Sequence, residues 1–85
     1  MSKKEKIKER FLSQCKDFTY DELVALLCSL GFVEQKRGHT TGSAVCFVHS
    51  SIGLPVRFHK PHPGHIIKTY LMKQIKEILE KEGLL

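Results

Sequence analysis

The sequence predicts a small α+β domain in which helices cover one face of a three-stranded antiparallel sheet, with an extra helix at the N-terminus. Apolar residues recur at helical spacing in three segments, and between the second and the third of these they alternate with a period of two. The 85 residues allow one domain, which we expect to span residues 1–85. Covering one face of the sheet is the simplest way to bury the helical stripes, and it leaves the other face open.

The extra helix is expected over residues 3–16, where apolar side chains fall at i, i+4 and i+8. These side chains are Ile7, Phe11 and Cys15. A helix this short is marginal on its own, so it must dock on another part of the chain. We therefore treat residues 1–17 as an accessory segment and residues 19–85 as the core of the domain.

A second helix is expected between Thr19, which forms a capping box with Glu22, and Gly31, which stands where a C-terminal glycine ends a helix. Its apolar stripe consists of Leu23, Leu26, Leu27 and Leu30.

The last helix is expected from about Ile66 to Glu82, after the two prolines of the 60–64 segment and before Gly83. Its apolar stripe consists of Ile67, Leu71, Ile75, Ile78 and Leu79. Three bases, Lys68, Lys73 and Lys76, lie beside or opposite this stripe.

Three strands are expected between these two helices, over residues 32–37, 43–49 and 54–59, with a loop at 38–42 and a turn at 50–53. Direct pairing across the four-residue turn sets the register of the last two strands. The predicted pairs are Phe47 with Val56 and Val45 with Phe58 on the buried face, and Cys46 with Arg57 and Ala44 with His59 on the open face. A slip of one residue would turn the aromatic side chains to water, so the assignment of the faces is well specified.

Charge is unevenly distributed along this basic chain, whose net charge is +5. Residues 36–76 hold seven Lys and Arg, no Asp or Glu, and all five histidines, whereas residues 17–35 hold four carboxylates and no base. Such an acid-free span attracts phosphate, so we expect an anionic partner, above all a nucleic acid. The alternative is a solvated basic surface that only aids solubility.

Several classes of protein are excluded by composition. No apolar run approaches the ~18 residues of a membrane span, and no apolar segment of a secretory signal follows the basic start. Three widely spaced cysteines without a CxxC motif do not suggest a disulfide framework, so we expect a cytoplasmic protein without membrane contact. Cys15 and Cys28 are expected on the apolar faces of their helices as small hydrophobic residues.

Four segments together resemble the HicA toxins of bacterial type II toxin–antitoxin systems. They are LCSLGF (27–32), GSAVCF (42–47), LPVRFHKPHPGHIIK (54–68) and IKEILEKEGLL (75–85). The resemblance covers roughly residues 19–85, and the leading helix is an addition typical of some members. It implies an α-β-β-β-α fold similar to a double-stranded-RNA-binding domain, a ribosome-independent mRNA endoribonuclease activity that inhibits translation and growth, and neutralisation by a HicB-type antitoxin.

The chain departs from the family at one position that carries chemistry. HicA proteins commonly read Gly-Ser-His at the start of the second strand, where this chain has Gly42, Ser43 and Ala44. The histidine expected to be catalytic is therefore absent, and its role is not carried over to Ala44.

Metal-free RNA cleavage needs a base for the 2′-hydroxyl, an acid for the leaving 5′-oxygen and cations for the phosphate, and histidine suits either proton role. His59 is the first candidate, because the predicted register places it across from Ala44. His62, in a proline-fixed loop, and His39, in a glycine-flanked loop, follow it. The alternative is that His59 binds phosphate or is simply an exposed residue at a strand end. The other two histidines, His49 and His65, are expected to be peripheral.

The candidate cations for phosphate contacts are Lys36, Arg57 and Lys60, and Lys68 would extend the footprint along the last helix. Each has the alternative of being an ordinary exposed base. A metal site at His59-x-x-His62-x-x-His65 is the other interpretation of the histidines, but no carboxylate lies nearby in the sequence to complete it. We therefore expect no metal and no cofactor.

Three hypotheses follow. The first is a HicA-type endoribonuclease that cleaves mRNA from the open sheet face and is neutralised by a HicB-type antitoxin. The second is a non-catalytic RNA-binding module of the same fold, and the third is an antitoxin-binding domain without RNA activity.

Overall fold

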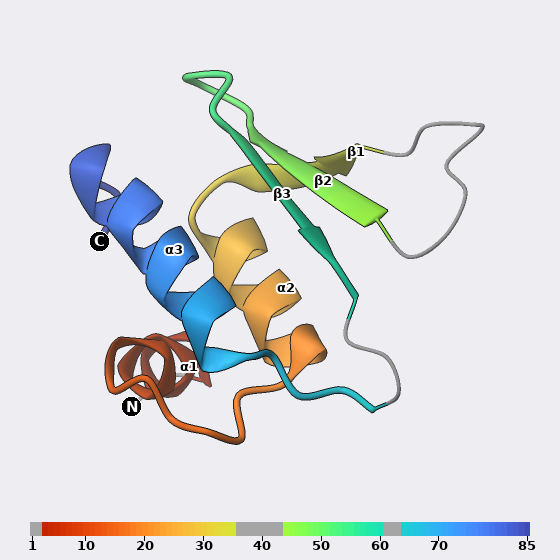
Figure 1. The fold of residues 1–85 in the computed structure, drawn as a ribbon. Coiled ribbons are helices and arrows are strands. Elements are labelled where there is room, and N and C mark those ends of the chain that lie inside the picture. The colour runs from red at the N-terminus through yellow and green to blue at the C-terminus, as the bar shows by residue number, and fades with distance from the viewer. Residues whose placement is uncertain (1–2, 36–43, 61–63) are drawn as a thin grey trace.

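The computed structural model describes residues 3–35, 44–60 and 64–85 and confirms the predicted α+β fold and the order of its elements (Figure 1). The elements are α1 (Lys3–Leu12), α2 (Tyr20–Ser29), β1 (Phe32–Gln35), β2 (Ala44–His49), β3 (Pro55–His59) and α3 (Thr69–Lys81). None of the helices in these ranges is long and apolar enough to cross a bilayer.

The three strands form an antiparallel sheet in the order β1-β2-β3. Every predicted pair between β2 and β3 is found, from Phe47 with Val56 to Ala44 with His59. The predicted turn closes the hairpin, because the His49 N–H donates to the Leu54 carbonyl at 2.9 Å. The first strand is an edge strand, and the loop expected at 38–42 lies outside the described residues.

Both α2 and α3 lie against one face of the sheet, and α1 lies across the starts of these two helices, away from the strands (Figure 1). One hydrophobic cluster joins the three helices to the sheet, with Phe11, Phe47 and Leu79 completely buried. The opposite face of the sheet is open, since Val33 is 58% exposed and Arg57 and His59 are exposed.

The accessory helix α1 docks through Ile7 and Phe11, and the Phe11 ring packs against Phe18 with centroids 5.5 Å apart. It ends at Leu12, four residues before the predicted end. The backbone of Gln14 is in the left-handed region, with φ 56°, and this conformation cannot continue a helix.

The predicted capping box at the start of α2 is present. The Glu22 N–H donates to the Thr19 hydroxyl oxygen at 3.1 Å, and the Thr19 N–H donates to the Glu22 carboxylate at 3.1 Å. The same carboxylate accepts two hydrogen bonds from Arg10 of α1, from Nε at 2.6 Å and from Nη2 at 3.1 Å. Glu22 therefore caps α2 and docks α1 at once.

The last helix begins at Thr69 rather than at about Ile66, so the predicted start is wrong by three residues. Residues 65–67 are held extended against residues 18–20 by a β-bridge between Thr19 and Ile66. Two hydrogen bonds flank this bridge, from the Tyr20 N–H to the His65 carbonyl at 2.7 Å and from the Ile67 N–H to the Phe18 carbonyl at 2.8 Å. The His65 carbonyl and the Ile67 N–H are thus bonded to residues 18–20 rather than within a helix. Ile67 is buried although it lies before the start of α3.

Cys28 is exposed, so its predicted place on the apolar face of α2 is wrong. It follows Leu27 directly and, at about 100° per residue, it is turned away from the leucine stripe. Cys15 is partly buried and packs against the hydrophobic core, as expected.

Glu22 makes the docking of α1 sensitive to pH. Partial burial alone would raise the pKa of this carboxyl, but the hydrogen bonds and charge of Arg10, with the hydrogen bonds of Thr19, outweigh burial and lower the pKa. A lowered pKa in the folded state means stability that is present above the unfolded pKa of about 4.3 and is lost as pH falls through the folded-state pKa.

We expect Glu22→Gln to lower the free energy of unfolding at pH 7, because Gln keeps the capping geometry but loses the charge that faces Arg10. The difference from the wild type should shrink as pH falls below the unfolded-state value of about 4.3 and through the lowered folded-state pKa of the carboxyl. Urea unfolding at a series of pH values measures it. In an Arg10→Met background the pH dependence of the difference should diminish, and a difference that is constant with pH in the wild-type background would contradict the ion-pair interpretation.

Candidate functional site

The open face of the sheet has an apolar end and a basic end, which the strand register places side by side. One cross-strand row consists of Val33, Val48 and Pro55, and the next of Gln35, Cys46 and Arg57. Beyond these rows, His59 is the Cα partner of Ala44. The face therefore changes from apolar next to the hairpin turn to basic where β3 ends.

The basic end brings together three of the predicted site residues: Arg57, His59 and Lys60. All three side chains are exposed, and they come from the second half of β3 and the residue that follows it. None of them forms an ion pair with any residue in the described ranges 3–35, 44–60 and 64–85. The positive charges of Arg57 and Lys60 are thus open to an anionic ligand.

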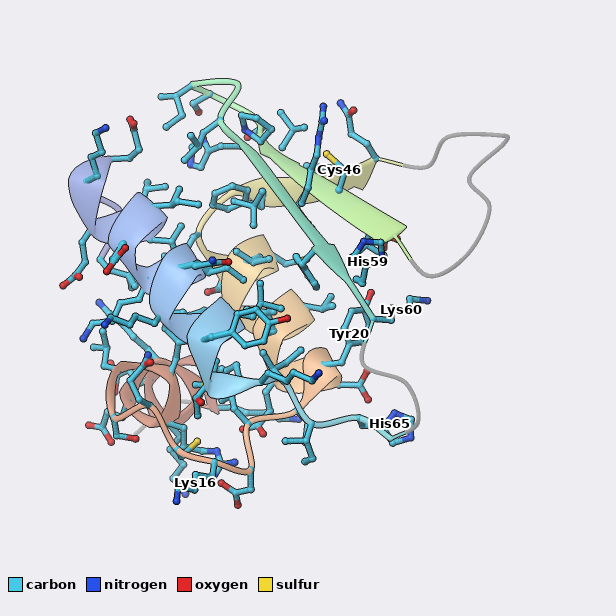
Figure 2. The ribbon with its side chains drawn as sticks, in the orientation of Figure 1. Lys16, Tyr20, Cys46, His59, Lys60 and His65 are labelled. Carbon is cyan, nitrogen blue, oxygen red and sulfur yellow. The ribbon has the colours of Figure 1, made fainter. Side chains whose placement is uncertain are left out.

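Tyr20, the first residue of α2, adds an aromatic ring to this end of the sheet (Figure 2). The Lys60 Nζ lies over the ring, 5.5 Å from its centroid, and the Phe58 ring packs against it at 6.1 Å. Burial, together with the negative charges of Glu34 and Asp21, raises the pKa of the Tyr20 phenol above its ordinary value of about 10. The phenol is therefore neutral at physiological pH and carries no charge that would neutralise Lys60.

Sequence reasoning missed Tyr20, because its contacts with Phe58 and Lys60 span almost forty positions of the chain. The only signal in the sequence was local: an aromatic residue stands between the N-cap Thr19 and the first acidic residues of α2, outside the leucine stripe.

Four further predicted residues have different outcomes. Lys68 is exposed and is the N-cap residue of α3, where its side chain makes no capping hydrogen bond. Lys36, His39 and His62 lie outside the described residues, so their predicted roles remain predictions.

His49, expected to be peripheral, is a buried structural residue with 9% of its surface exposed. Its Nε2 donates to the Leu30 carbonyl at 2.9 Å, and its Nδ1 accepts from the backbone N–H groups of Ser51 and Ile52 at 3.2 and 3.4 Å. The ring also lies edge-on to Phe32, at 5.2 Å between centroids. These bonds fix the orientation of the ring and tie the hairpin turn to the end of α2.

Gly31 makes room for this histidine. A Cβ at that position would lie 3.0 Å from the His49 Nε2, and the backbone φ of +101° is one that other residues rarely adopt. The helix-ending glycine predicted from the sequence thus also suits the close packing of His49.

The described residues contain no group of three side chains that could hold a metal ion. His65 is exposed, and its backbone carbonyl, rather than its imidazole, is engaged by Tyr20. The metal alternative also needs His62, which the structure does not describe.

A comparison with protein families finds that the model of the HicA toxin of bacterial toxin–antitoxin systems matches residues 20–84. The chain belongs to the HicA toxin family. No curated protein and no solved structure matches it.

The match begins at Tyr20 and so covers α2, the sheet and α3, but leaves α1 outside. Membership of a toxin–antitoxin family implies that this HicA protein has an antitoxin as its partner. The basic end of the sheet and the Tyr20 ring lie within the matched part, whereas the Arg10–Glu22 pair joins the matched part to α1.

Two histidine variants should separate a structural role from a role in the site. We expect His49→Ala to destabilise the fold by on the order of 2 kcal/mol, because it leaves buried backbone groups without partners and opens a cavity beside Phe32. His59→Ala should change the stability by less than about 0.5 kcal/mol, because the side chain is exposed. Thermal and urea unfolding of the two variants compare them directly, and equal losses of stability would contradict this assignment.

Proposed function

We propose that this HicA protein is a metal-independent mRNA endoribonuclease of the cytoplasm, which works from the open face of its sheet and is neutralised by a HicB-type antitoxin. The observation that carries the proposal is the grouping of Arg57, His59 and Lys60 at one end of that face, exposed and without an acidic partner in the described parts of the chain. A cationic site of this kind suits an anionic substrate such as a phosphodiester better than an uncharged or cationic one.

The chemistry divides between proton transfer and charge stabilisation. A base removes the proton of the 2′-hydroxyl, the 2′-oxygen attacks phosphorus, and the 5′-oxygen leaves with a proton from an acid. We assign one of the two proton transfers to His59 and the other to His62 or His39. Arg57 and Lys60 would hold the phosphate and offset its growing negative charge, while Lys36 and Lys68 would contact neighbouring phosphates.

Ala44 favours a second candidate function, that of a non-catalytic RNA-binding module. The histidine common at this place in the family is missing, and a site with cations but one imidazole too few would bind RNA without cutting it. Against this, His59 is the Cα partner of Ala44, so an imidazole is still carried by the same row of the sheet.

The apolar end of the open face supports the antitoxin part of the proposal. Val33, Val48 and Pro55 form a continuous row beside the basic end, and Ile52 of the hairpin turn is 52% exposed. Contiguous exposed apolar residues are typical of protein contacts. An antitoxin that covers this row and offers carboxylates to Arg57 and Lys60 would close the site to RNA. In the third hypothesis, the antitoxin-binding domain, the open face contacts only the antitoxin and binds no RNA.

The activity test compares the wild type with His59→Ala on a single-stranded RNA, with protein purified free of antitoxin. We expect the wild type to release fragments in the presence of a metal chelator, and His59→Ala to be slower by about 10²–10⁴-fold, the usual contribution of a general acid or base. Lys16→Ala is the matched control, because Lys16 is exposed and lies at the α1 end of the molecule, far from His59 (Figure 2). Unchanged cleavage by His59→Ala would remove this residue from the proposed mechanism.

The binding test measures how RNA affinity depends on salt, with the His59→Ala protein so that the RNA stays intact. The affinity falls as salt rises, so the slope of log K against log salt is negative. Replacing Arg57 or Lys60 by Ala should make this slope shallower by about 0.7 for each phosphate that the variant no longer neutralises. Lys16→Ala should leave the slope unchanged. If the wild-type protein binds RNA in a salt-dependent way but never cuts it, the result favours the non-catalytic RNA-binding module. If it binds no RNA even at low salt, the result favours the antitoxin-binding domain without RNA activity.

A further inference from the structure

Tyr20 contacts the chain on both sides of residues 61–64, which follow β3 and Lys60. Before that segment, its ring lies under the Lys60 ammonium, with Nζ 5.5 Å from the centroid. After it, the Tyr20 backbone N–H donates to the His65 carbonyl at 2.7 Å. Figure 2 shows His59, Lys60 and Tyr20 following one another down one side of the molecule, with His65 below them.

The start of α2 does not itself need an aromatic residue at this position. The capping box of Thr19 and Glu22 already satisfies the first backbone groups of the helix, and the leucine stripe supplies its buried face. The ring is half-buried and is directed towards β3, where it packs on Phe58. Its other contact is with a residue proposed to bind RNA.

We propose that Tyr20 is a positioning residue, whose ring holds the Lys60 ammonium beside His59 in readiness for an RNA phosphate. This inference deepens the proposed function and rests on it. Tyr20 does not touch the reacting atoms and acts through Lys60.

The physical case is that an aromatic ring restrains a lysine without neutralising it. A free lysine side chain has a large rotamer entropy, which is lost when it binds a phosphate. A carboxylate would restrain it too, but would compete with the phosphate for the same charge. The face of a neutral ring attracts the ammonium while leaving its N–H groups for a ligand.

The surroundings of Tyr20 provide the rigidity that this role requires. The ring is braced by Phe58 of β3, and the backbone is fixed by the Thr19–Ile66 bridge and the hydrogen bond to His65. Asp21 and Glu34 are close enough to act electrostatically on the Tyr20 phenol, yet neither pairs with Lys60 in the described structure. The ring, rather than a carboxylate, is thus the partner of Lys60.

The first experiment needs no RNA. Ring currents shift the methylene protons of a lysine that lies over an aromatic face upfield, and this shift is read by NMR. We expect an upfield shift of the Lys60 protons in the wild type and in Tyr20→Phe, and its loss in Tyr20→Leu. Tyr20→Met serves as a second non-aromatic variant if Tyr20→Leu does not fold. A Lys60 signal that is unshifted in the wild type would overturn the inference, whatever the protein does to RNA.

The second experiment is a double-mutant cycle for binding of a single-stranded 2′-O-methyl oligoribonucleotide, which the enzyme cannot cleave. Tyr20→Leu should weaken binding about two- to fivefold, the factor expected from one exposed cation–π contact, and Tyr20→Phe should bind like the wild type. In the Lys60→Ala background, Tyr20→Leu should cause no further loss.

The outcomes separate this inference from the proposed function. Equal losses from Tyr20→Leu with and without Lys60 would indicate a merely structural role and overturn the inference. Weaker binding by Lys60→Ala with no effect of Tyr20→Leu would also overturn it, while leaving the RNA site intact. Failure of the wild type to bind the oligonucleotide at low salt would instead overturn the proposed function.

Discussion

The β-bridge between Thr19 and Ile66, with the two hydrogen bonds beside it, joins the segments that precede the two sheet-covering helices. This junction fixes where α2 and α3 start relative to each other and to the end of β3. It places Tyr20 against Phe58 and under Lys60. The contribution of Tyr20 to the candidate site therefore depends on these few backbone contacts.

The acidic and basic parts of the chain have separate tasks because of this arrangement. Arg10 of α1 binds Glu22 at 2.6 Å and Asp17 at 3.4 Å, so two of the carboxylates between residues 17 and 35 are used to attach the accessory helix. These carboxylates are thereby kept from the basic end of the sheet, where Arg57 and Lys60 have no ion-pair partner among the described residues. A net charge of +5 would be of little use to a phosphate ligand if the acids and bases of the chain had paired with one another.

Features set by neighbouring residues were predictable from the sequence. The alternation of residues 43–49 and 54–59 specifies which face buries Phe47 and Phe58, and direct pairing across a four-residue turn gives the register that the structure has. The capping box was predictable for the same reason, because Thr19 and Glu22 are three residues apart.

Features that depend on distant segments were not predictable in this way. The helical spacing of apolar residues begins at Ile66, but the bridge to Thr19 holds residues 65–67 extended, and α3 begins at Thr69. The apolar spacing of a helix does not reveal a pairing with a distant segment. His49 looked like the end of a strand, and its burial depends on the Leu30 carbonyl and on the space left by Gly31. Tyr20 belongs to the candidate site because its ring contacts Lys60, which follows the end of β3 and lies far from Tyr20 in the sequence.

The histidine missing from β2 changes what the proposed catalysis depends on. Cβ atoms of directly opposed residues in an antiparallel pair are about 5 Å apart, so an imidazole on β3 at His59 can serve the same region of the face as one on β2 at the Ala44 position. However, β2 is the central strand and is held on both sides, whereas β3 is an edge strand that ends at His59. The position of the His59 imidazole therefore depends on the contacts that hold the end of β3 in place. In this chain that end is held by the pairing of His59 with Ala44 and braced by Phe58 and Lys60, which both contact the Tyr20 ring, so the geometry of the proposed site also depends on the junction at the start of α2.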